Sequence, residues 1–373
     1  MKERIDAAID KAMGEKRITG TAIIVKKDGE TVFERFDGFA DRESGKPVEP
    51  DTIFRLASVT KPLVAATALA MIDKGKLSLD TLVREPLPYF TPKERDGTLP
   101  DITVRHLLTH TAGFSYGINA YGKPASGQEV DEGLVNSDLS FEENFRRMAA
   151  IPLLYKPGKL WRYSTAIDVL GAVIAAVEGT SLDEALRKYV TGPLGMSDTG
   201  FVLSDKDRLA TPYADAKPEP VVMQDPHTVP DREGNPLTFS PNRIFNPKAY
   251  QSGGAGAVGT APDIIAFLEA IRQGGAPILS KDITAQAMAN QIGTTPRPDT
   301  EAGIRFGFIG AVIEDEAVSR VKLPKGTVNW GGVYGHSWFI DPVNGISTII
   351  MTNNAVEGCM GAYPGEIMKA IYG

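Results

Sequence analysis

The sequence contains very little cysteine, no long apolar run and no excess of positive charge. Its 373 residues include one cysteine, Cys359, so no intramolecular disulfide is possible. No cysteine–histidine cluster has the spacing of a zinc site, and no run of about 18 apolar residues suits a transmembrane helix. The net charge of −7 gives no reason to expect nucleic acid or an anionic membrane as a partner. These absences favour an ordinary globular protein without a metal or a disulfide framework.

The first 20 residues, MKERIDAAIDKAMGEKRITG, are charged throughout. A secretory signal peptide needs an apolar core of about 7–15 residues, which this segment lacks. We therefore expect a cytoplasmic protein, unless a leader has been removed from this sequence. The length predicts one large domain or two packed domains.

The pattern of apolar residues differs between the chain ends and the middle. Residues 3–14 have helical spacing, and two β-rich runs flank Asp28-Gly29, a strong hairpin signal. Further strand-like runs follow residue 304, with a second tight turn at Asn344-Gly345. The middle has helical segments separated by long irregular stretches over residues 114–140 and 202–250.

This pattern predicts an α/β (α+β) fold. An antiparallel sheet formed by both chain ends, residues 1–75 and 290–373, is flanked by helices, and residues 76–289 form a mostly helical region. Because ligand sites tend to lie at such junctions, we expect the site between the two regions.

The stretch LASVTKPLVAAT, residues 56–67, contains Ser58 three residues before Lys61. Pro62 is tolerated only in the first turn of a helix, which predicts a helix start near Val59 or Thr60. One interpretation is that Ser58 caps this helix, a common role for serine. However, Lys61 lies at the positive end of the helix dipole, the wrong end for a cation.

A second interpretation explains Lys61. Burial and the dipole both favour the neutral form of a lysine, which is a base, and a serine needs an adjacent base to become a nucleophile. The three-residue spacing puts both side chains on one helix face, and the unpaired N–H groups of the helix start can stabilise an oxyanion. The four residues alone do not decide between cap and nucleophile.

Two other segments provide candidate partners. In PGKLWRYSTAIDVLG, residues 157–171, Tyr163 comes just before a predicted helix. In NWGGVYGHSWFIDP, residues 329–342, Gly331 and Gly332 precede a strand-like run and allow close backbone approach to a ligand.

Together these segments resemble the serine hydrolases of the class C β-lactamase fold, which include penicillin-binding-like D,D-peptidases and the family VIII carboxylesterases. FRLASVTKPLVAATAL resembles the family's Ser-x-x-Lys helix, and DITVRHLLTHTAGF its following segment. PGKLWRYST is similar to the tyrosine motif, and SGGAGAVGTAPDIIAFLEAI to a late glycine-rich turn and helix. The four matches occur in order and span nearly the whole chain.

The resemblance implies the site residues. Ser58 would be the nucleophile, and Lys61 and Tyr163 the base system that takes its proton and returns it to the leaving group; which of the two is the direct base stays open. The backbone N–H groups of Ser58 and Val333 would form the oxyanion hole. The resemblance implies neither a metal nor an organic cofactor.

Two departures from the β-lactamase pattern favour an esterase. Trp330-Gly331-Gly332 stands where Lys-Thr-Gly is usual, so no positive charge is available for a drug carboxylate. Tyr163-Ser164-Thr165 lacks the asparagine of the usual Tyr-x-Asn. Both features resemble the family VIII carboxylesterases.

We therefore expect a serine carboxylesterase for small or short-acyl esters, with a small-molecule ester as its partner. A β-lactamase, a D-amino-acid peptidase or amidase, and an acyltransferase are alternatives on the same machinery. A non-catalytic ligand-binding relative is a further alternative.

Several other residues are candidates for substrate contact, and others match catalytic or metal motifs only in part. Trp330, Tyr116 and Tyr121 are expected to contact the substrate, because aromatic residues and loop residues commonly line ligand pockets. His336 is expected to border the site because it follows the Trp330 motif. Ser115 in GFSYG matches Gly-x-Ser-x-Gly, but a nucleophile elbow requires a preceding strand and a following helix, which are not predicted here. His106 and His110 have i, i+4 spacing without an HExxH pattern, which favours a packing or helix-terminal role over a metal site.

Overall fold

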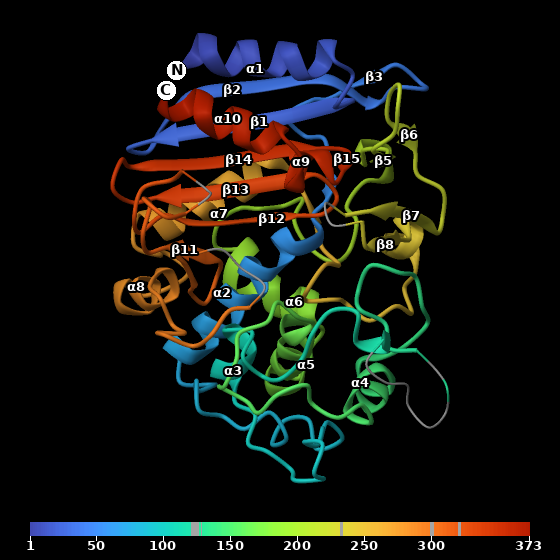
Figure 1. The fold of residues 1–373 in the computed structure, drawn as a ribbon, viewed down its shortest axis with the longest axis vertical. Coiled ribbons are helices and arrows are strands. Elements are labelled where there is room, and N and C mark those ends of the chain that lie inside the picture. Colours follow the sequence, from blue (N-terminus) through green and yellow to red (C-terminus); the bar gives the residue numbers. More distant parts are fainter. Residues whose placement is uncertain (121–126, 128, 232–233, 299–301, 320–321) are drawn as a thin grey trace.

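The computed structural model describes residues 1–373 apart from 121–126, 128, 232–233, 299–301 and 320–321. In this part of the chain, eight strands form one antiparallel sheet to which both chain ends contribute (Figure 1). Across the sheet the order is β10 (Ile304–Phe306), β11 (Ala311–Ile313), β12 (Val328–Gly332), β13 (His336–Asp341), β14 (Ile346–Thr352), β1 (Gly20–Lys27), β2 (Glu30–Asp41) and β3 (Lys46–Pro47). The predicted fold class is confirmed.

Both predicted hairpins are present. The β1–β2 turn contains Asp28 and Gly29 with φ values of 50° and 95°, and the β13–β14 turn contains Gly345 with φ 68°. The two chain ends meet where β1 pairs with β14, with Ile23 opposite Ile350. Glycine and asparagine-type residues allow these positive φ values.

Helices cover both faces of the sheet because its central strands are apolar on both faces. On β1, Ile23 and Val25 pack with α1 (Lys2–Gly14) and α10 (Tyr363–Tyr372). Ala22 and Ile24 belong to the core on the opposite face, where α7 (Ala261–Arg272) lies. The N- and C-termini lie close together beside α1 and α10 (Figure 1).

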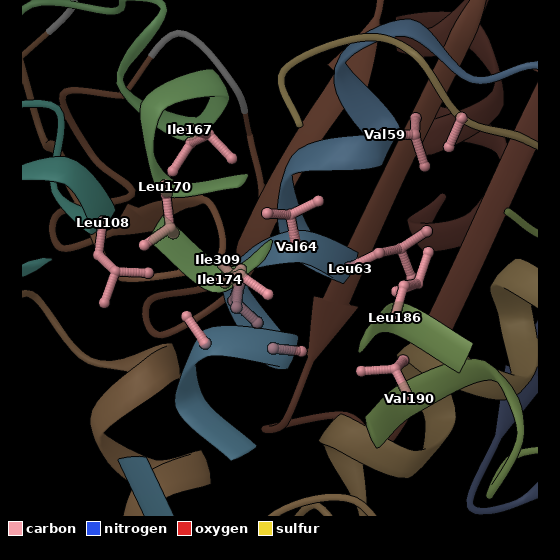
Figure 2. Packing of buried hydrophobic residues seen from close by; sticks show 14 of the residues in the cluster. Val59, Leu63, Val64, Leu108, Ile167, Leu170, Ile174, Leu186, Val190 and Ile309 are labelled. Atoms are coloured by element: carbon pink, nitrogen blue, oxygen red, sulfur yellow. The ribbon is translucent and has the colours of Figure 1, made fainter. Parts of the chain in front are cut away.

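The helix α2 (Thr60–Asp73) connects the sheet to the helical region. Every residue from Thr60 to Met71 is buried, so this helix has no solvent face and runs through the centre of the molecule. It packs against α5 (Ala166–Glu178) and α6 (Leu182–Leu186). Figure 2 shows Leu63 and Val64 among the side chains of this core.

The remaining elements are short. The other helices are α3 (Val104–Leu108), α4 (Phe141–Ala149), α8 (Lys281–Met288) and α9 (Glu357–Met360). The other strands are β4 (Phe54–Arg55) with β9 (Val258–Gly259), β7 (His227–Pro230) with β8 (Pro236–Phe239), and β5 (Tyr213–Ala214) between β6 (Val221–Val222) and β15 (Asn354–Ala355). None of the described helices is both long and apolar enough to cross a membrane.

The predicted division of the chain at residues 75 and 290 stays a prediction. The helix α7 belongs to the predicted helical region by sequence but packs on β14 and β1 of the sheet. The 3₁₀ turn Ala57–Val59, which precedes α2, contacts β12 of the sheet, and the candidate site lies at this contact.

Candidate active site

Ser58 lies in a 3₁₀ turn, Ala57–Val59, immediately before α2. The cap of α2 is Val59, and no side chain makes a capping hydrogen bond there, so the interpretation of Ser58 as a helix cap is wrong. The preceding Ala57 is fully buried with φ 44°, a left-handed conformation that costs a non-glycine residue about 1–3 kcal/mol. Such strain is common where a turn presents a functional side chain.

Lys61 is joined to Ser58 by a direct hydrogen bond. Its Nζ lies 3.1 Å from the Oγ of Ser58, 2.9 Å from the hydroxyl of Tyr116 and 2.7 Å from the carbonyl oxygen of Gly254. The lysine is only 5% exposed, so these three groups replace water around its amine. The structure therefore brings the predicted nucleophile and base together.

Two tyrosine rings enclose the amine of Lys61. Its Nζ lies 5.2 Å from the ring centroid of Tyr116 and 4.7 Å from that of Tyr163, and the two ring centroids are 5.2 Å apart. Burial raises the pKa of Tyr116 well above its usual range. Tyr116 therefore keeps its proton at neutral pH, and its hydroxyl is a dipole rather than a charge beside the lysine.

Trp330 orients Tyr163. The indole Nε1 donates a hydrogen bond of 3.1 Å to the tyrosine hydroxyl, and the two ring centroids lie 4.9 Å apart. Trp330, which stands where the lysine of Lys-Thr-Gly is usual, thus contacts the predicted base system directly. It supplies a neutral donor and an apolar surface where a cation is usual.

Gly332 allows β12 to lie against the turn that carries Ser58. A Cβ atom at this position would be 2.3 Å from the carbonyl oxygen of Leu56 and 3.3 Å from the backbone nitrogen of Ser58. Among the described residues, the backbone N–H groups of Ser58 and Val333 donate no hydrogen bond. Two unpaired donors on adjoining segments are what an oxyanion hole requires.

Asp168 is a buried carboxylate beside the Lys61 network that was not among the predicted site residues. Its Oδ1 accepts hydrogen bonds from the hydroxyl of Ser252 at 2.5 Å and from the N–H of Gly254 at 3.2 Å. These bonds fix the turn whose Gly254 carbonyl binds Lys61. Its Oδ2 is buried and has no partner in the part of the chain that is described. Burial raises the pKa of Asp168, and the charge of Lys61 opposes that rise.

One sequence signal for Asp168 was available. It is the only charged residue in AIDVLGAVIAAV, residues 166–177, and carboxylates are almost never fully buried without a partner. Gly254 belongs to the glycine-rich segment already noted, but no pattern indicates that its carbonyl faces Lys61.

The decoy candidates have local structural partners. Ser115 donates its hydroxyl hydrogen bond to the carbonyl of Tyr116, and His106 accepts the N–H of Thr103 as part of a capping box on α3. His110 is buried against Tyr163, with ring centroids 5.0 Å apart, and burial lowers its pKa well below the usual range. Among the described residues, no group of three or more histidine, cysteine, aspartate or glutamate side chains is placed to hold a metal.

The predicted place of His336 beside the substrate stays a prediction. Its ring is 1% exposed, contacts Phe54 edge-on and lies 2.8 Å from the carbonyl oxygen of Arg55 through Nε2. No hydrogen bond joins it to Ser58 or Lys61. Tyr121 lies outside the described residues.

The chain is similar to known proteins over nearly its whole length. A family model described as Beta-lactamase matches residues 5–363. Esterase EstB from Burkholderia gladioli is 43% identical over 374 residues, covering 99% of this chain and 94% of its own length.

Solved structures give the same result. EstCE1, described as a hydrolase with promiscuous acyltransferase activity, aligns with a TM-score of 0.91 at 40% identity, covering 100% of this chain and 98% of its own. Simvastatin synthase (LovD) from Aspergillus terreus, with a TM-score of 0.75 at 21% identity, covers 99% of this chain and 97% of its own and shares the fold. Since the family match extends over nearly the whole sequence, this chain belongs to the beta-lactamase family.

Proposed function

We propose that this protein is a serine carboxylesterase that hydrolyses small or short-acyl esters through an acyl-enzyme on Ser58. The observation that carries the proposal is the 3.1 Å contact between Lys61 Nζ and Ser58 Oγ, at the start of a buried helix and beside two unpaired N–H groups. The 43% identity to Esterase EstB supports the same reaction class.

The three partners of Lys61 support its role as the direct base. A neutral amine has two N–H donors and one lone pair. It can donate to the carbonyl of Gly254 and the hydroxyl of Tyr116 while its lone pair faces the hydroxyl of Ser58. In this arrangement, the serine proton passes to Lys61 as Oγ attacks the ester carbonyl.

The carbonyl oxygen becomes an oxyanion held by the N–H groups of Ser58 and Val333. Lys61 then returns the proton, directly or through the Tyr163 hydroxyl, to the departing alcohol. Water attacks the acyl-enzyme by the same route and restores Ser58. Every proton taken from a nucleophile is returned to a leaving group, so no cofactor is needed.

The absence of a charged side chain in Trp330-Gly331-Gly332 favours esters over β-lactams as substrates. Trp330 contributes an indole whose N–H is already bonded to Tyr163, so no cation is available at this place for a drug carboxylate. We therefore expect p-nitrophenyl acetate to be turned over far faster than a chromogenic cephalosporin. Comparable kcat/KM values for the two substrates would favour the β-lactamase alternative.

Acyl transfer is a second candidate function. EstCE1, 40% identical to this chain, is described as a hydrolase with promiscuous acyltransferase activity. An acyl-enzyme can react with an alcohol instead of water, and product analysis with an added alcohol acceptor measures that partition.

A cytoplasmic location stays a prediction from the sequence.

The test is hydrolysis of p-nitrophenyl acetate by Ser58→Ala and Ser115→Ala variants. We expect Ser58→Ala to lose about 10³-fold or more in kcat and Ser115→Ala to retain most activity. An active Ser58→Ala variant would overturn the proposed mechanism.

A further inference from the structure

A small cavity adjoins the turn of residues 252–256, whose Gly254 carbonyl binds Lys61. Its volume is about 60 Å³, room for a carboxylate group or about two water molecules. Arg55, Ser240, Arg243 and Tyr334 line it together with Ser252. The mechanism above uses none of the first four side chains.

Arg55 lines this cavity and forms no ion pair within 4 Å among the described residues. Its Nε and Nη1 donate to the carbonyl oxygens of Pro241 and Ala210, both at 2.9 Å, and its Nη2 makes no hydrogen bond among the described residues. No described carboxylate lies within 4 Å of its guanidinium, whereas the neighbouring Arg243 pairs with Asp131 at 2.6 Å. Burial lowers the pKa of Arg55, and the nearby Tyr334 and Asp225 oppose this shift without forming an ion pair with it.

Two hydroxyl groups on largely buried residues accompany Arg55. Tyr334 is 6% exposed and Ser240 5% exposed, and neither hydroxyl forms a hydrogen bond in the described part of the chain. Burial raises the pKa of Tyr334, so its hydroxyl remains a donor at neutral pH. None of these donor atoms is among the fully buried side-chain atoms that lack a partner, so the two hydroxyls and Arg55 Nη2 are accessible to solvent. Unpaired, accessible donors beside a cation in a cavity are suited to an anionic ligand.

The same chain segments bound this cavity and the catalytic site. Arg55 precedes Ser58 by three residues, and Tyr334 follows Val333, the predicted oxyanion donor. The 252–256 turn contributes Ser252, Ala255 and Gly256 to the cavity wall and the Gly254 carbonyl to Lys61. Ser58 and Lys61 do not line the cavity themselves, so these shared segments are the link between a group bound in the cavity and a substrate on Ser58.

We propose that this cavity is a subsite for a carboxylate on the ester substrate, bound by Arg55 Nη2 and the Tyr334 hydroxyl. The inference rests on the proposed esterase function and narrows its substrate class to esters that carry a second, ionised carboxyl group. A carboxylate pairs with the Arg55 guanidinium and accepts from two or more donors, which a neutral acyl chain cannot do.

The test compares pairs of ethyl esters that differ only at the end of the acyl chain. The monoethyl esters of succinate, glutarate and adipate carry a terminal carboxylate, and ethyl butyrate, valerate and hexanoate carry a methyl group at the same place. The readout is the ratio of kcat/KM for the charged ester to that for its neutral partner. We expect Arg55→Met to lower this ratio about tenfold or more at the best-fitting chain length, the loss typical of one charge-assisted hydrogen bond.

Tyr334→Phe keeps the ring and removes only the hydroxyl, so it tests the subsite even if Arg55→Met fails to fold. Arg105→Met is the matched control, because Arg105 is another arginine bonded to a neutral group, Gln291, and it does not line this cavity. A ratio that stays at the wild-type value in Arg55→Met and Tyr334→Phe, at every chain length, overturns the subsite.

A free anion is the alternative occupant. In that case added acetate changes kcat/KM for the neutral esters in wild type but not in Arg55→Met. The ratio of kcat/KM for the charged ester to that for its neutral partner then stays the same in both proteins. This result would show that the substrate subsite is wrong. If the wild type hydrolyses neutral esters but none of the charged ones, the subsite is also wrong while the esterase function stands. If Ser58-dependent hydrolysis of the neutral esters is absent, the proposed function itself fails.

Discussion

At the scale of single residues, the charge of Asp168 bears on Lys61. A carboxylate near a lysine favours the protonated amine, which cannot accept the serine proton. Asp168→Asn keeps an acceptor oxygen for Gly254 and removes the charge. We expect the acid limb of the kcat/KM profile to move to lower pH in this variant.

The control for this variant is Asp263→Asn. Asp263 is also a partly buried carboxylate whose pKa is raised by burial, but it binds Thr199 and the N–H of Asp198 rather than the Lys61 network. Its pH profile should match that of the wild type. An acid limb that does not move in Asp168→Asn, or moves equally in both variants, contradicts the electrostatic role of Asp168.

His336 makes stability depend on pH. Burial lowers its pKa from 6.5 to about 4, so the unfolded chain binds its proton first as pH falls. Its contribution to the free energy of unfolding is therefore constant above pH 6.5, falls between pH 6.5 and 4, and levels off below pH 4, a loss of about 3 kcal/mol. Urea unfolding at several pH values should show a shallower dependence in His336→Gln than in wild type; equal slopes would contradict this assignment.

Local chemistry in the sequence was sufficient to place Ser58 and Lys61 together, because only three residues separate them across the 3₁₀ turn and the start of α2. It also placed Trp330 and Tyr116 among the site candidates, and both contact the base system. Asp168 could not be predicted in the same way, since its partner Ser252 is 84 residues away and only the tertiary structure brings them together.

At the scale of elements, the separation between β12 and the 3₁₀ turn determines the oxyanion hole. In Gly332→Ala the new Cβ meets the carbonyl oxygen of Leu56 at 2.3 Å, a backbone atom that cannot move alone. The strand must shift away from Ser58 and take Val333 with it. We expect kcat/KM to fall by about 10²-fold or more, the cost of losing an oxyanion donor.

Gly365→Ala on α10 is the matched glycine control. No atom lies within 4 Å of the position of a Cβ there, and alanine favours a helix over glycine by about 1 kcal/mol. This variant should keep wild-type kinetics with an equal or higher melting temperature. If Gly332→Ala keeps wild-type kinetics too, β12 does not control the oxyanion hole.

The long helices and the central strands were predictable because their apolar spacing is regular. The helix α2 starts at Thr60, as the proline rule indicates, and both tight turns lie at the predicted residues. The helix α4 was missed within a polar region, although its capping box of Ser140 and Glu143 is a recognisable start signal. The strands β5 to β8 are too short for alternation to be visible in the sequence.

At the scale of the whole molecule, the sheet that combines both chain ends was predictable from strand-like runs at each end. The position of α7 was not, because an apolar helix in the middle of the chain can pack on either layer. It covers the sheet face opposite α1 and α10 (Figure 1). Order along the chain therefore predicted the layers of this fold better than it predicted which helix belongs to which layer.

The central claim is that a single serine in the protein, Ser58, forms the acyl-enzyme. Intact-mass measurement after treatment with a fluorophosphonate, followed by peptide mapping, tests it directly. We predict one adduct per chain, located on Ser58, and no adduct in Ser58→Ala. An adduct on Ser115 or another residue, or a wild-type chain that remains unlabelled, would contradict the account.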